Sequence, residues 1–391
     1  MPRRSIAEHV AFVTALASPL PALPMPPETG FVLAEDAVAQ LAVPPFDNSA
    51  MDGFLVHRAD LPGVLRVVAD VPAGSRPARL GPGEAARIMT GAPVGPDGDC
   101  VIPVEDTDHP AGPGPLPATV SVPAYPGRDH IRARGDNSSP GDLVLGEGSL
   151  IDAGALAALI SAGVTAVLAH PRPRVAVISS GDELVAAGGP LDVSQIPDSN
   201  LPMLAALVRA NGAADVLQFH AGDRDGDFRA VLDDASAAAD VVITSGGVST
   251  GAFDVVKTVT SGAHMWFGSV NMKPGSPQGA GLWNGRPLLC LPGNPVAAFV
   301  SFHLFGVPVL RILAGDTRPV PRVRLTGGVD KFPTAGGVPR VVPVRVSFDG
   351  EITAEPFHSR ASSHLVASLA GTNGLALVTG GDTLDILLTR T

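Results

Sequence analysis

A short polar segment in the first part of the chain concentrates groups that can do chemistry. It reads Pro44-Pro45-Phe46-Asp47-Asn48-Ser49-Ala50-Met51-Asp52-Gly53-Phe54, with two carboxylates, an amide and a hydroxyl. No helical or strand periodicity runs through it, so we expect a rigid loop that presents polar side chains. A surface turn is the simpler interpretation, because Asp, Asn and Ser form turns through local hydrogen bonds. A functional interpretation therefore depends on partners elsewhere in the chain.

Two glycine-rich loops follow apolar, strand-like runs further along. They read Ser245-Gly246-Gly247-Val248-Ser249 and Pro292-Gly293-Asn294-Pro295. Glycine lets the backbone approach a ligand, Asn294 is positioned to cap a helix, and Pro295 suits the first helical position. A helix N-terminus of this kind favours anions. Each loop alone could be an ordinary tight turn, but two at one sheet edge favour a ligand with more than one phosphate-like group.

Carboxylates stand where further strands are expected to end. They are Asp182, Glu183, Asp223 and Asp254. Oxygen ligands of this kind suit Mg²⁺, which binds one or two carboxylates and completes its shell with water and substrate phosphates. Such an ion would neutralise charge during cleavage of a phosphoanhydride. The alternative is that these residues are solvated turn formers, and Asp223 could be no more than a helix cap.

Lysine is scarce, which draws attention to Lys273. The chain has 27 basic residues, but its lysines are only Lys257, Lys273 and Lys331. A lysine at a Met-Lys-Pro-Gly corner supplies a compact point charge that can be aimed at an oxyanion. Chance placement is the alternative interpretation.

Composition limits the possible classes of protein. Hydrophobic residues make up 45% and charged residues 17% of 391 residues, as in globular proteins of two or three domains. A net charge of −11 argues against a nucleic-acid binder, so an anionic substrate must be held by local donors. The two cysteines, Cys100 and Cys290, lack metal or disulfide spacing, which is consistent with a reducing compartment.

The elements that must position these residues fall into four parts. Strands alternate with helices over 171–316, which predicts an α/β domain with a parallel sheet and ligands at its carboxyl edge. Short apolar runs between turns predict an inserted β-rich domain over 44–130. Segments 1–43 and 131–170 would form a discontinuous linker domain around it, and 317–391 a C-terminal β domain.

Two apolar segments resemble a signal peptide or a membrane span and have to be distinguished from them. Ser5 and Glu8 have the spacing of a capping box and predict a helix that ends by Pro19, where a signal peptide would need an uninterrupted apolar core. The run 296–313 is the one candidate membrane span. Because it contains His303 and opens from a functional-looking loop, we interpret it as a buried helix.

In combination, these motifs resemble those of a known family. The polar segment is followed, in order, by Arg87-Ile88-Met89-Thr90-Gly91-Ala92-Pro93, Ser180-Gly181-Asp182-Glu183-Leu184, Asp198-Ser199-Asn200, Ser245 to Ser249, Met272-Lys273-Pro274-Gly275 and Leu291-Pro292-Gly293-Asn294-Pro295. Over nearly the whole chain this is similar to the molybdopterin molybdenumtransferases, the MoeA-type enzymes related to the C-terminal domain of gephyrin. The resemblance implies an elongated multidomain α/β plus β protein with a MogA-like doubly wound domain and a C-terminal β-barrel-like domain.

The resemblance also implies an activity and a site. Such enzymes insert molybdenum from molybdate into adenylylated molybdopterin with Mg²⁺ and release AMP. They are cytoplasmic homodimers in which the loop 47–53 completes the other subunit's site, with molybdopterin adenylyltransferase and molybdoenzymes as partners and neither nucleic acid nor membrane. The implied catalytic residues are Asp47, Asp52, Glu183, Asp254 and Lys273. The implied ligand-binding residues are Asn48, Ser49, Thr90, Gly91, Ser180, Gly181, Asp182, Asp198, Asn200, Ser245, Gly246, Gly247, Ser249, Pro292, Gly293, Asn294, Pro295, Ser362 and Ser363. The implied metal ligands are Asp182, Glu183, Asp223 and Asp254.

Four positions depart from the family pattern. Ser269 and Ser276 stand where lysines are frequent, Asn137 where an acid is usual, and Pro197 where an aromatic residue is usual. Loss of two cations predicts weaker binding of an oxyanion, because charge-assisted hydrogen bonds contribute about 1.5–3 kcal/mol each. A paralogue that binds molybdopterin as a gephyrin-like scaffold is one alternative. A molybdopterin adenylyltransferase is the other, although it would not need the loop 47–53 or the β domains.

Overall fold

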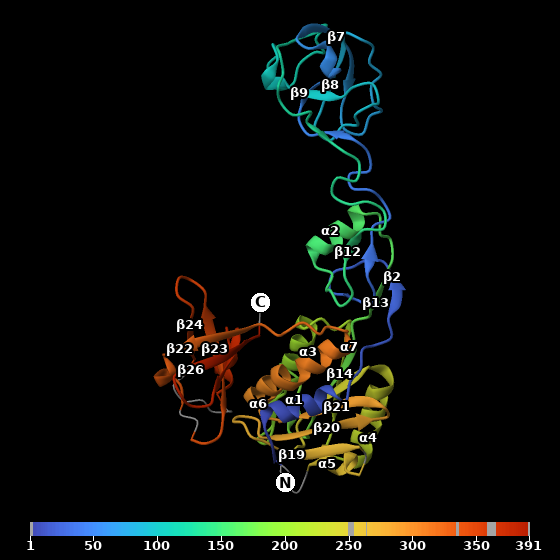
Figure 1. The fold of residues 1–391 in the computed structure, drawn as a ribbon. Coiled ribbons are helices and arrows are strands. Elements are labelled where there is room, and N and C mark those ends of the chain that lie inside the picture. Colours follow the sequence, from blue (N-terminus) through green and yellow to red (C-terminus); the bar gives the residue numbers. More distant parts are fainter. Residues whose placement is uncertain (1–2, 249–253, 263, 334–335, 358–364, 390–391) are drawn as a thin grey trace.

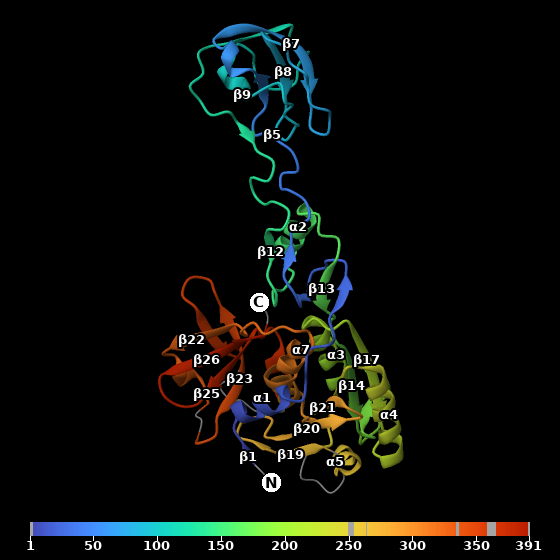
Figure 2. The same cartoon turned by 45° about the vertical axis from the view of Figure 1, so that its right-hand side comes forward.

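The molecule is elongated, and its first strand and its C-terminal domain lie in the same half. The computed structural model describes residues 3–248, 254–262, 264–333, 336–357 and 365–389. A β-rich domain lies at one end, a small linker domain follows, and the α/β domain lies beside the C-terminal β domain at the other end (Figure 1, Figure 2). The long axis therefore separates the polar segment near residue 50 from the glycine-rich loops.

The β-rich domain is a five-stranded sheet in the order β10-β7-β8-β6-β9. Its strands are β6 (Gly53–Val56), β7 (Gly63–Val71), β8 (Glu84–Ile88), β9 (Cys100–Pro103) and β10 (Thr119–Val122), with short 3₁₀ turns η1 (Arg58–Asp60) and η2 (Val104–Asp106). Alternate side chains point into a core around Phe54, Ile102 and Val120, all fully buried. The apolar runs of the sequence predict four of these strands. They miss β8, whose Glu-Ala-Ala-Arg-Ile sequence has little β propensity.

The linker domain is assembled from two pieces of chain. Its elements are β2 (Leu23–Met25), β3 (Val32–Leu33), β4 (Ala37–Val38), β12 (Leu143–Leu145), α2 (Ala153–Ser161) and β13 (Val167–His170). The short strands β5 (Asn48–Ser49) and β11 (Ile131–Arg132) lie at the base of the β-rich domain, where the chain enters and leaves it (Figure 2). Strands from the outgoing and the returning segments pair as β4 with β12, β5 with β11, and β13 with β2 and β3. Asp152 caps α2 by accepting a 2.8 Å hydrogen bond from the Ala155 amide.

The α/β domain is built on a seven-stranded sheet in the order β1-β19-β20-β21-β18-β14-β17. The strands are β1 (Arg3–Arg4), β14 (Arg174–Ser180), β17 (Asp215–Ala221), β18 (Val241–Ser245), β19 (Met265–Val270), β20 (Pro277–Trp283) and β21 (Arg286–Leu291). The prediction of a parallel sheet is wrong for β20, which runs antiparallel to both its neighbours. The reason is a two-residue hairpin between β20 and β21, in which Asn284 and Gly285 have φ of +48° and +78°.

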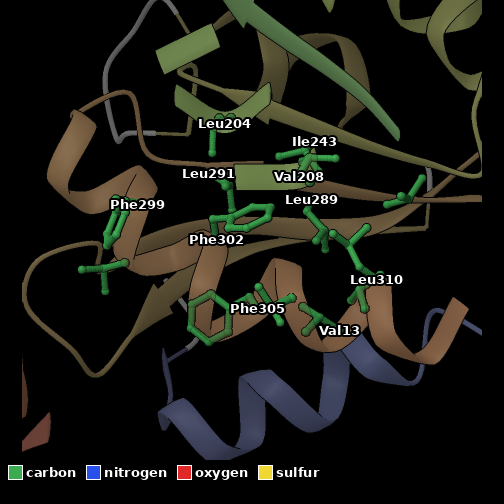
Figure 3. Packing of buried hydrophobic residues seen from close by; sticks show 14 of the residues in the cluster. Val13, Leu204, Val208, Ile243, Leu289, Leu291, Phe299, Phe302, Phe305 and Leu310 are labelled. Carbon is green, nitrogen blue, oxygen red and sulfur yellow. The ribbon is translucent and has the colours of Figure 1, made fainter. Parts of the chain in front are cut away.

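Helices cover both faces of this sheet and bury its two cores. They are α1 (Ile6–Thr14), α3 (Asn200–Ala210), α4 (Asp225–Ala238), α5 (Val255–Thr260), α6 (Pro295–Ser301) and α7 (Val307–Leu313), with a π-helical turn η3 (Phe302–Gly306) joining the last two. Figure 3 shows Phe302 and Phe305 between the sheet and α1, near Val13 and Leu310, with Phe299 to one side on α6. On the other face, α4 and α5 contribute a second core.

Two predictions about helices are confirmed. Ser5 and Glu8 form the capping box of α1, although the helix ends at Thr14 rather than near Pro19. Pro295–Leu313 is long and apolar enough to cross a membrane, and of the described residues it is the one such segment. However, 78% of its apolar window is buried inside the protein. It is a core helix.

The C-terminal domain is a five-stranded antiparallel sheet in the order β22-β26-β25-β23-β24. Its strands are β22 (Arg322–Thr326), β23 (Arg340–Ser347), β24 (Thr353–Pro356), β25 (Gly374–Val378) and β26 (Thr383–Leu388), with 3₁₀ turns η4 (Val329–Lys331) and η5 (Val366–Leu369). The backbone of Lys273 joins it to the α/β domain, because the Lys273 amide donates to the Pro339 carbonyl and the Val341 amide to the Lys273 carbonyl, both at 3.0 Å.

Candidate active site

A cavity of about 1000 Å³ opens where β14, β18 and β21 end. The three strands are parallel to one another, so their carboxyl ends meet at the same edge of the sheet. Ser180 at the end of β14, Gly181 after it, Gly246 after β18 and Gly293 after β21 all line it. The structure therefore brings together the loops that the sequence singled out in the α/β domain.

Asn200 ties these loops to one another. It is the first residue of α3, is 7% exposed, and its Nδ2 donates to Ser245 Oγ at 2.7 Å and to the Gly293 carbonyl at 2.6 Å. Its Oδ1 is buried without a hydrogen-bond partner among the described residues. A buried acceptor of this kind is costly unless a ligand satisfies it. One side chain thus fixes the spacing of two loops, and its unpaired buried acceptor belongs to a residue that lines the cavity.

Glycines let the loops approach each other closely. Gly246 and Gly247 have φ of +108° and +64°, a region that other residues rarely adopt. A Cβ at Gly247 would lie 2.5 Å from a side-chain carbon of Val256 in α5, and a Cβ at Gly293 would lie 3.3 Å from the Gly246 Cα. A side chain at these positions would push the loops apart. The glycines are therefore required by the packing at this edge.

Asn294 does not play the capping role that its position suggests. It occupies the N-cap of α6 with an extended backbone, but its side chain makes no capping hydrogen bond, so that prediction is wrong. Its Oδ1 is buried without a partner among the described residues and lines the cavity. Pro295 at the first helical position needs no donor there, which removes one reason for a cap. Asn294 therefore keeps an unpaired buried acceptor in a residue that lines the cavity.

The four predicted metal ligands separate into two kinds. Glu183, Asp223 and Asp254 line the cavity, and Asp182 does not. Asp182 and Asp223 each accept a hydrogen bond from the other's backbone amide, at 3.2 and 3.1 Å. Asp223 does not cap α4, whose N-cap is Arg224. No three acidic, histidine or cysteine side chains among the described residues converge as a metal cluster. A cation here would need substrate oxygens to complete its shell.

Asp254 is the carboxylate with the most unusual surroundings. Its Oδ2 is buried with no hydrogen-bond partner in the described part of the chain. Burial raises the pKa of Asp254 above its ordinary value, and the nearby charge of Lys257 opposes that rise only partly. Glu183 differs, because its carboxylate folds back over Gly181 at an exposed corner. Asp254 therefore lines the cavity and keeps one buried carboxylate oxygen without a partner among the described residues.

Positive charge at the cavity comes from two side chains of the described residues, Lys273 and Arg3. Lys273 lies in the turn that joins β19 to β20. Arg3 lies in β1, one of the two edge strands of the sheet. The cavity therefore has cations on the side formed by β1 and the Lys273 turn, and acids on the side formed by Glu183, Asp223 and Asp254.

The polar segment near residue 50 is rigid but lies far from this cavity within one chain (Figure 1). Asp52 accepts hydrogen bonds from the Thr90 amide at 2.6 Å and from the Thr90 hydroxyl at 2.8 Å. These two bonds lower the pKa of Asp52. Asp47 accepts from the Arg134 amide at 2.6 Å. Both carboxylates thus fix the loop locally, and the linker domain stands between them and the cavity.

Comparison with known proteins identifies the family. The MoeA N-terminal region (domain I and II) matches residues 4–163, a probable molybdopterin binding domain matches 176–312, and the MoeA C-terminal region (domain IV) matches 329–384. Molybdopterin molybdenumtransferase 2 of Mycobacterium tuberculosis is 42% identical over 334 residues, 81% of each chain. The chain belongs to the MoeA family. Molybdopterin molybdenumtransferase of Staphylococcus aureus is 30% identical over 98% of this chain and 95% of its own.

Solved structures agree with the MoeA assignment. The molybdopterin biosynthesis MoeA protein of Pyrococcus horikoshii aligns over all of both chains with a TM-score of 0.76 and 25% identity. The predicted fold class, an elongated α/β plus β protein, is confirmed by this similarity.

Several predicted site residues are placed outside the cavity or outside the described residues. Asp198 is buried and accepts a 3.0 Å hydrogen bond from the Leu201 amide, so it holds the start of α3. Ser249, Ser362 and Ser363 lie outside the residues that the structure describes. Sequence reasoning missed Arg3, because a two-residue edge strand leaves no periodic signal.

Proposed function

We propose that this protein transfers molybdenum from molybdate to adenylylated molybdopterin and releases AMP. The observation that carries the proposal is the cavity formed by the Ser180, Gly246 and Gly293 loops, in a chain 42% identical to a molybdopterin molybdenumtransferase. Backbone amides of glycine loops and the Lys273 ammonium suit phosphate and molybdate oxygens. Nothing in the comparisons favours a scaffold or an adenylyltransferase.

The unpaired acceptors at the wall suit the other parts of the substrate. Asn200 Oδ1 and Asn294 Oδ1 can accept hydrogen bonds from the N–H groups of a pterin or from ribose hydroxyls. A ligand that satisfies both would recover the cost of burying them. A substrate analogue without those donors should bind more weakly, because both acceptors would stay unpaired.

Mg²⁺ would bind in the same cavity together with the substrate, because the side chains of the described residues alone do not form a complete coordination shell. Asp254, with its unpaired buried oxygen, and Glu183 would hold it, and substrate phosphate and water would fill the remaining positions. When bound, the ion would neutralise charge on the phosphoanhydride. Lys273 would hold the molybdate oxygens, and the glycine loops would keep the phosphates oriented.

We also propose a homodimer that shares its sites. Asp47 and Asp52 are held rigidly at the far end of an elongated chain, so they could act at the cavity only of a second copy. Mixing an Asp47→Ala subunit with a Lys273→Ala subunit should restore activity to part of the heterodimers. Lack of rescue in confirmed heterodimers of folded variants would reject the shared site.

The activity is tested by adding molybdate and Mg²⁺ to purified protein loaded with adenylylated molybdopterin. The transferase proposal predicts release of AMP that depends on molybdate. A scaffold would bind the substrate without releasing AMP, and an adenylyltransferase would instead form the adenylylated substrate from molybdopterin and ATP. A cytoplasmic location, and exchange of substrate and product with molybdopterin adenylyltransferase and molybdoenzymes, belong to the same proposal.

A further inference from the structure

The N-terminal strand brings a cation into the cavity from the opposite end of the sequence. β1 pairs in parallel with β19, with Arg3 opposite Ser269 and Arg4 opposite Val270. The Arg3 side chain lines the cavity together with Lys273. Figure 1 shows the N-terminal segment beside β19, at the edge of the sheet. Arg3 is thus part of the cavity wall rather than of a free N-terminal tail.

The residues that follow Arg3 hold it in this position. The Arg4 guanidinium lies 3.8 Å from the ring centroid of Phe12 and 4.1 Å from that of Trp266, and the Arg4 carbonyl accepts a 2.7 Å hydrogen bond from the Asn271 amide. The capping box of Ser5 then starts α1 directly. Because side chains alternate along a strand, anchoring Arg4 among these rings directs Arg3 to the other side, toward the cavity.

The Arg3 guanidinium keeps most of its hydrogen-bonding capacity. Among the described residues its side-chain hydrogen bond goes to the neutral Asn271 Oδ1, and it makes no salt bridge. The arginine side chain carries five N–H donors in a planar fork. An arginine that faces a cavity without a carboxylate partner is available to an anionic ligand.

The rest of the wall explains why a second cation is needed there. The cavity wall also holds Glu183, Asp223 and Asp254, and the whole chain has a net charge of −11. Ser276 contributes no charge and donates its hydroxyl to the Val270 carbonyl at 2.9 Å. Lys273 alone would face a dianion against three carboxylates.

We infer that Arg3 binds a tetrahedral oxyanion in this cavity, next to Lys273. Molybdate and the phosphate groups of the nucleotide share this chemistry, and the guanidinium fork can donate two parallel hydrogen bonds to either. The identity of these ligands rests on the proposed function, but binding of the anion does not depend on turnover. Arg3 acts as a binding residue contributed by the N-terminal strand.

The test measures equilibrium binding of sodium molybdate and, separately, of AMP to the full-length protein and four variants. Arg3→Ala removes the guanidinium, and Arg3→Lys keeps the charge but loses the fork. Arg209→Ala is the matched control, because Arg209 is exposed and lies at the far end of α3, roughly 14 Å along the helix from Asn200. The fourth, Arg3→Ala with Ser269→Lys, returns a cation to the paired position on β19, roughly 4.8 Å away.

Arg3→Ala should weaken binding of at least one anion about tenfold or more, the factor that corresponds to roughly 1.4 kcal/mol. The affinity of Arg3→Lys should lie between those of Arg3→Ala and the parent. The double variant Arg3→Ala with Ser269→Lys should recover part of the lost affinity, and Arg209→Ala should bind as the parent does. A loss for molybdate alone identifies molybdate as the ligand of Arg3, and a loss for AMP alone identifies the nucleotide phosphate.

The inference is overturned if Arg3→Ala and Arg3→Lys bind both anions as tightly as the parent, or if the parent binds neither. Thermal unfolding of each variant shows whether β1 and α1 remain in place. If Arg3→Ala unfolds, the comparison of Arg3→Lys with the parent decides. A parent that binds anions through Arg3 but releases no AMP would refute the transferase and leave this inference standing.

Discussion

Asn200→Ala tests whether one buried amide sets the geometry of the cavity. The substitution removes two hydrogen bonds, of 2.7 Å to Ser245 and 2.6 Å to Gly293, from a side chain that is 7% exposed. At about 1 kcal/mol for each bond, the α/β domain should lose about 2 kcal/mol of its free energy of unfolding. The Ser245 and Gly293 loops also lose the side chain that hydrogen-bonds to both of them, so the affinity for the nucleotide should fall as well.

The assay follows urea unfolding by tryptophan fluorescence, together with AMP binding to the folded variant. Both tryptophans of the chain, Trp266 in β19 and Trp283 in β20, belong to the sheet of the α/β domain, so their emission reports that domain. Asn211→Ala is the matched control. Its Nδ2 donates one 2.8 Å hydrogen bond to the Leu207 carbonyl at the far end of the same helix.

The control should lose about 1 kcal/mol of stability and keep its AMP affinity. Asn200→Ala should lose about twice as much and bind AMP at least about fivefold more weakly, a difference of roughly 1 kcal/mol. If Asn200→Ala binds AMP as the parent does, or loses no more stability than the control, the reasoning about the Ser245 and Gly293 loops is refuted.

Three further substitutions probe charge and packing. Asp254→Asn should raise stability by about 1 kcal/mol at pH 7, because it removes a buried unpaired charge, while AMP release falls. Since burial raises the pKa of Asp254, this gain in urea stability should disappear as the pH falls below the folded pKa. Burial alone would raise the pKa of Asp316, but hydrogen bonds from Arg318 and Arg311 lower it well below its ordinary value. Asp316→Asn should therefore cost about 2–3 kcal/mol at pH 7, with the difference shrinking as the pH falls below about 4. Gly247→Ala should lower AMP affinity and stability by about 1–3 kcal/mol, because its Cβ would lie 2.5 Å from a side-chain carbon of α5. An unchanged urea midpoint in any of the three would contradict the contact it tests.

Local chemistry made much of the α/β domain predictable. Apolar runs that end in glycine-rich loops mark β18 and β21, and parallel strands place their loops at one edge, so the meeting of Gly246 and Gly293 follows from the sequence pattern. The capping box of Ser5 is equally local, since its two hydrogen bonds connect residues three apart.

Three other features of the sheet and the cavity do not follow from these patterns. The antiparallel β20 was missed, although Asn284-Gly285 is a hairpin signal that the sequence offers. Arg3 reaches the cavity only because β1 pairs with a strand more than 260 residues later, and two residues have no periodicity to detect. The unpaired Oδ1 of Asn294 could not be foreseen, because N-cap residues of this type normally use that oxygen.

The most direct test of the central claim is a single-turnover measurement that counts molybdenum bound to the pterin for each AMP released. Purified protein is loaded with adenylylated molybdopterin, and molybdate and Mg²⁺ are added. The account predicts about one molybdenum per AMP, no AMP without molybdate, and loss of both products in Lys273→Ala. AMP release that is independent of molybdate, or AMP without molybdenum on the pterin, would contradict the assignment of this cavity as the site of metal transfer.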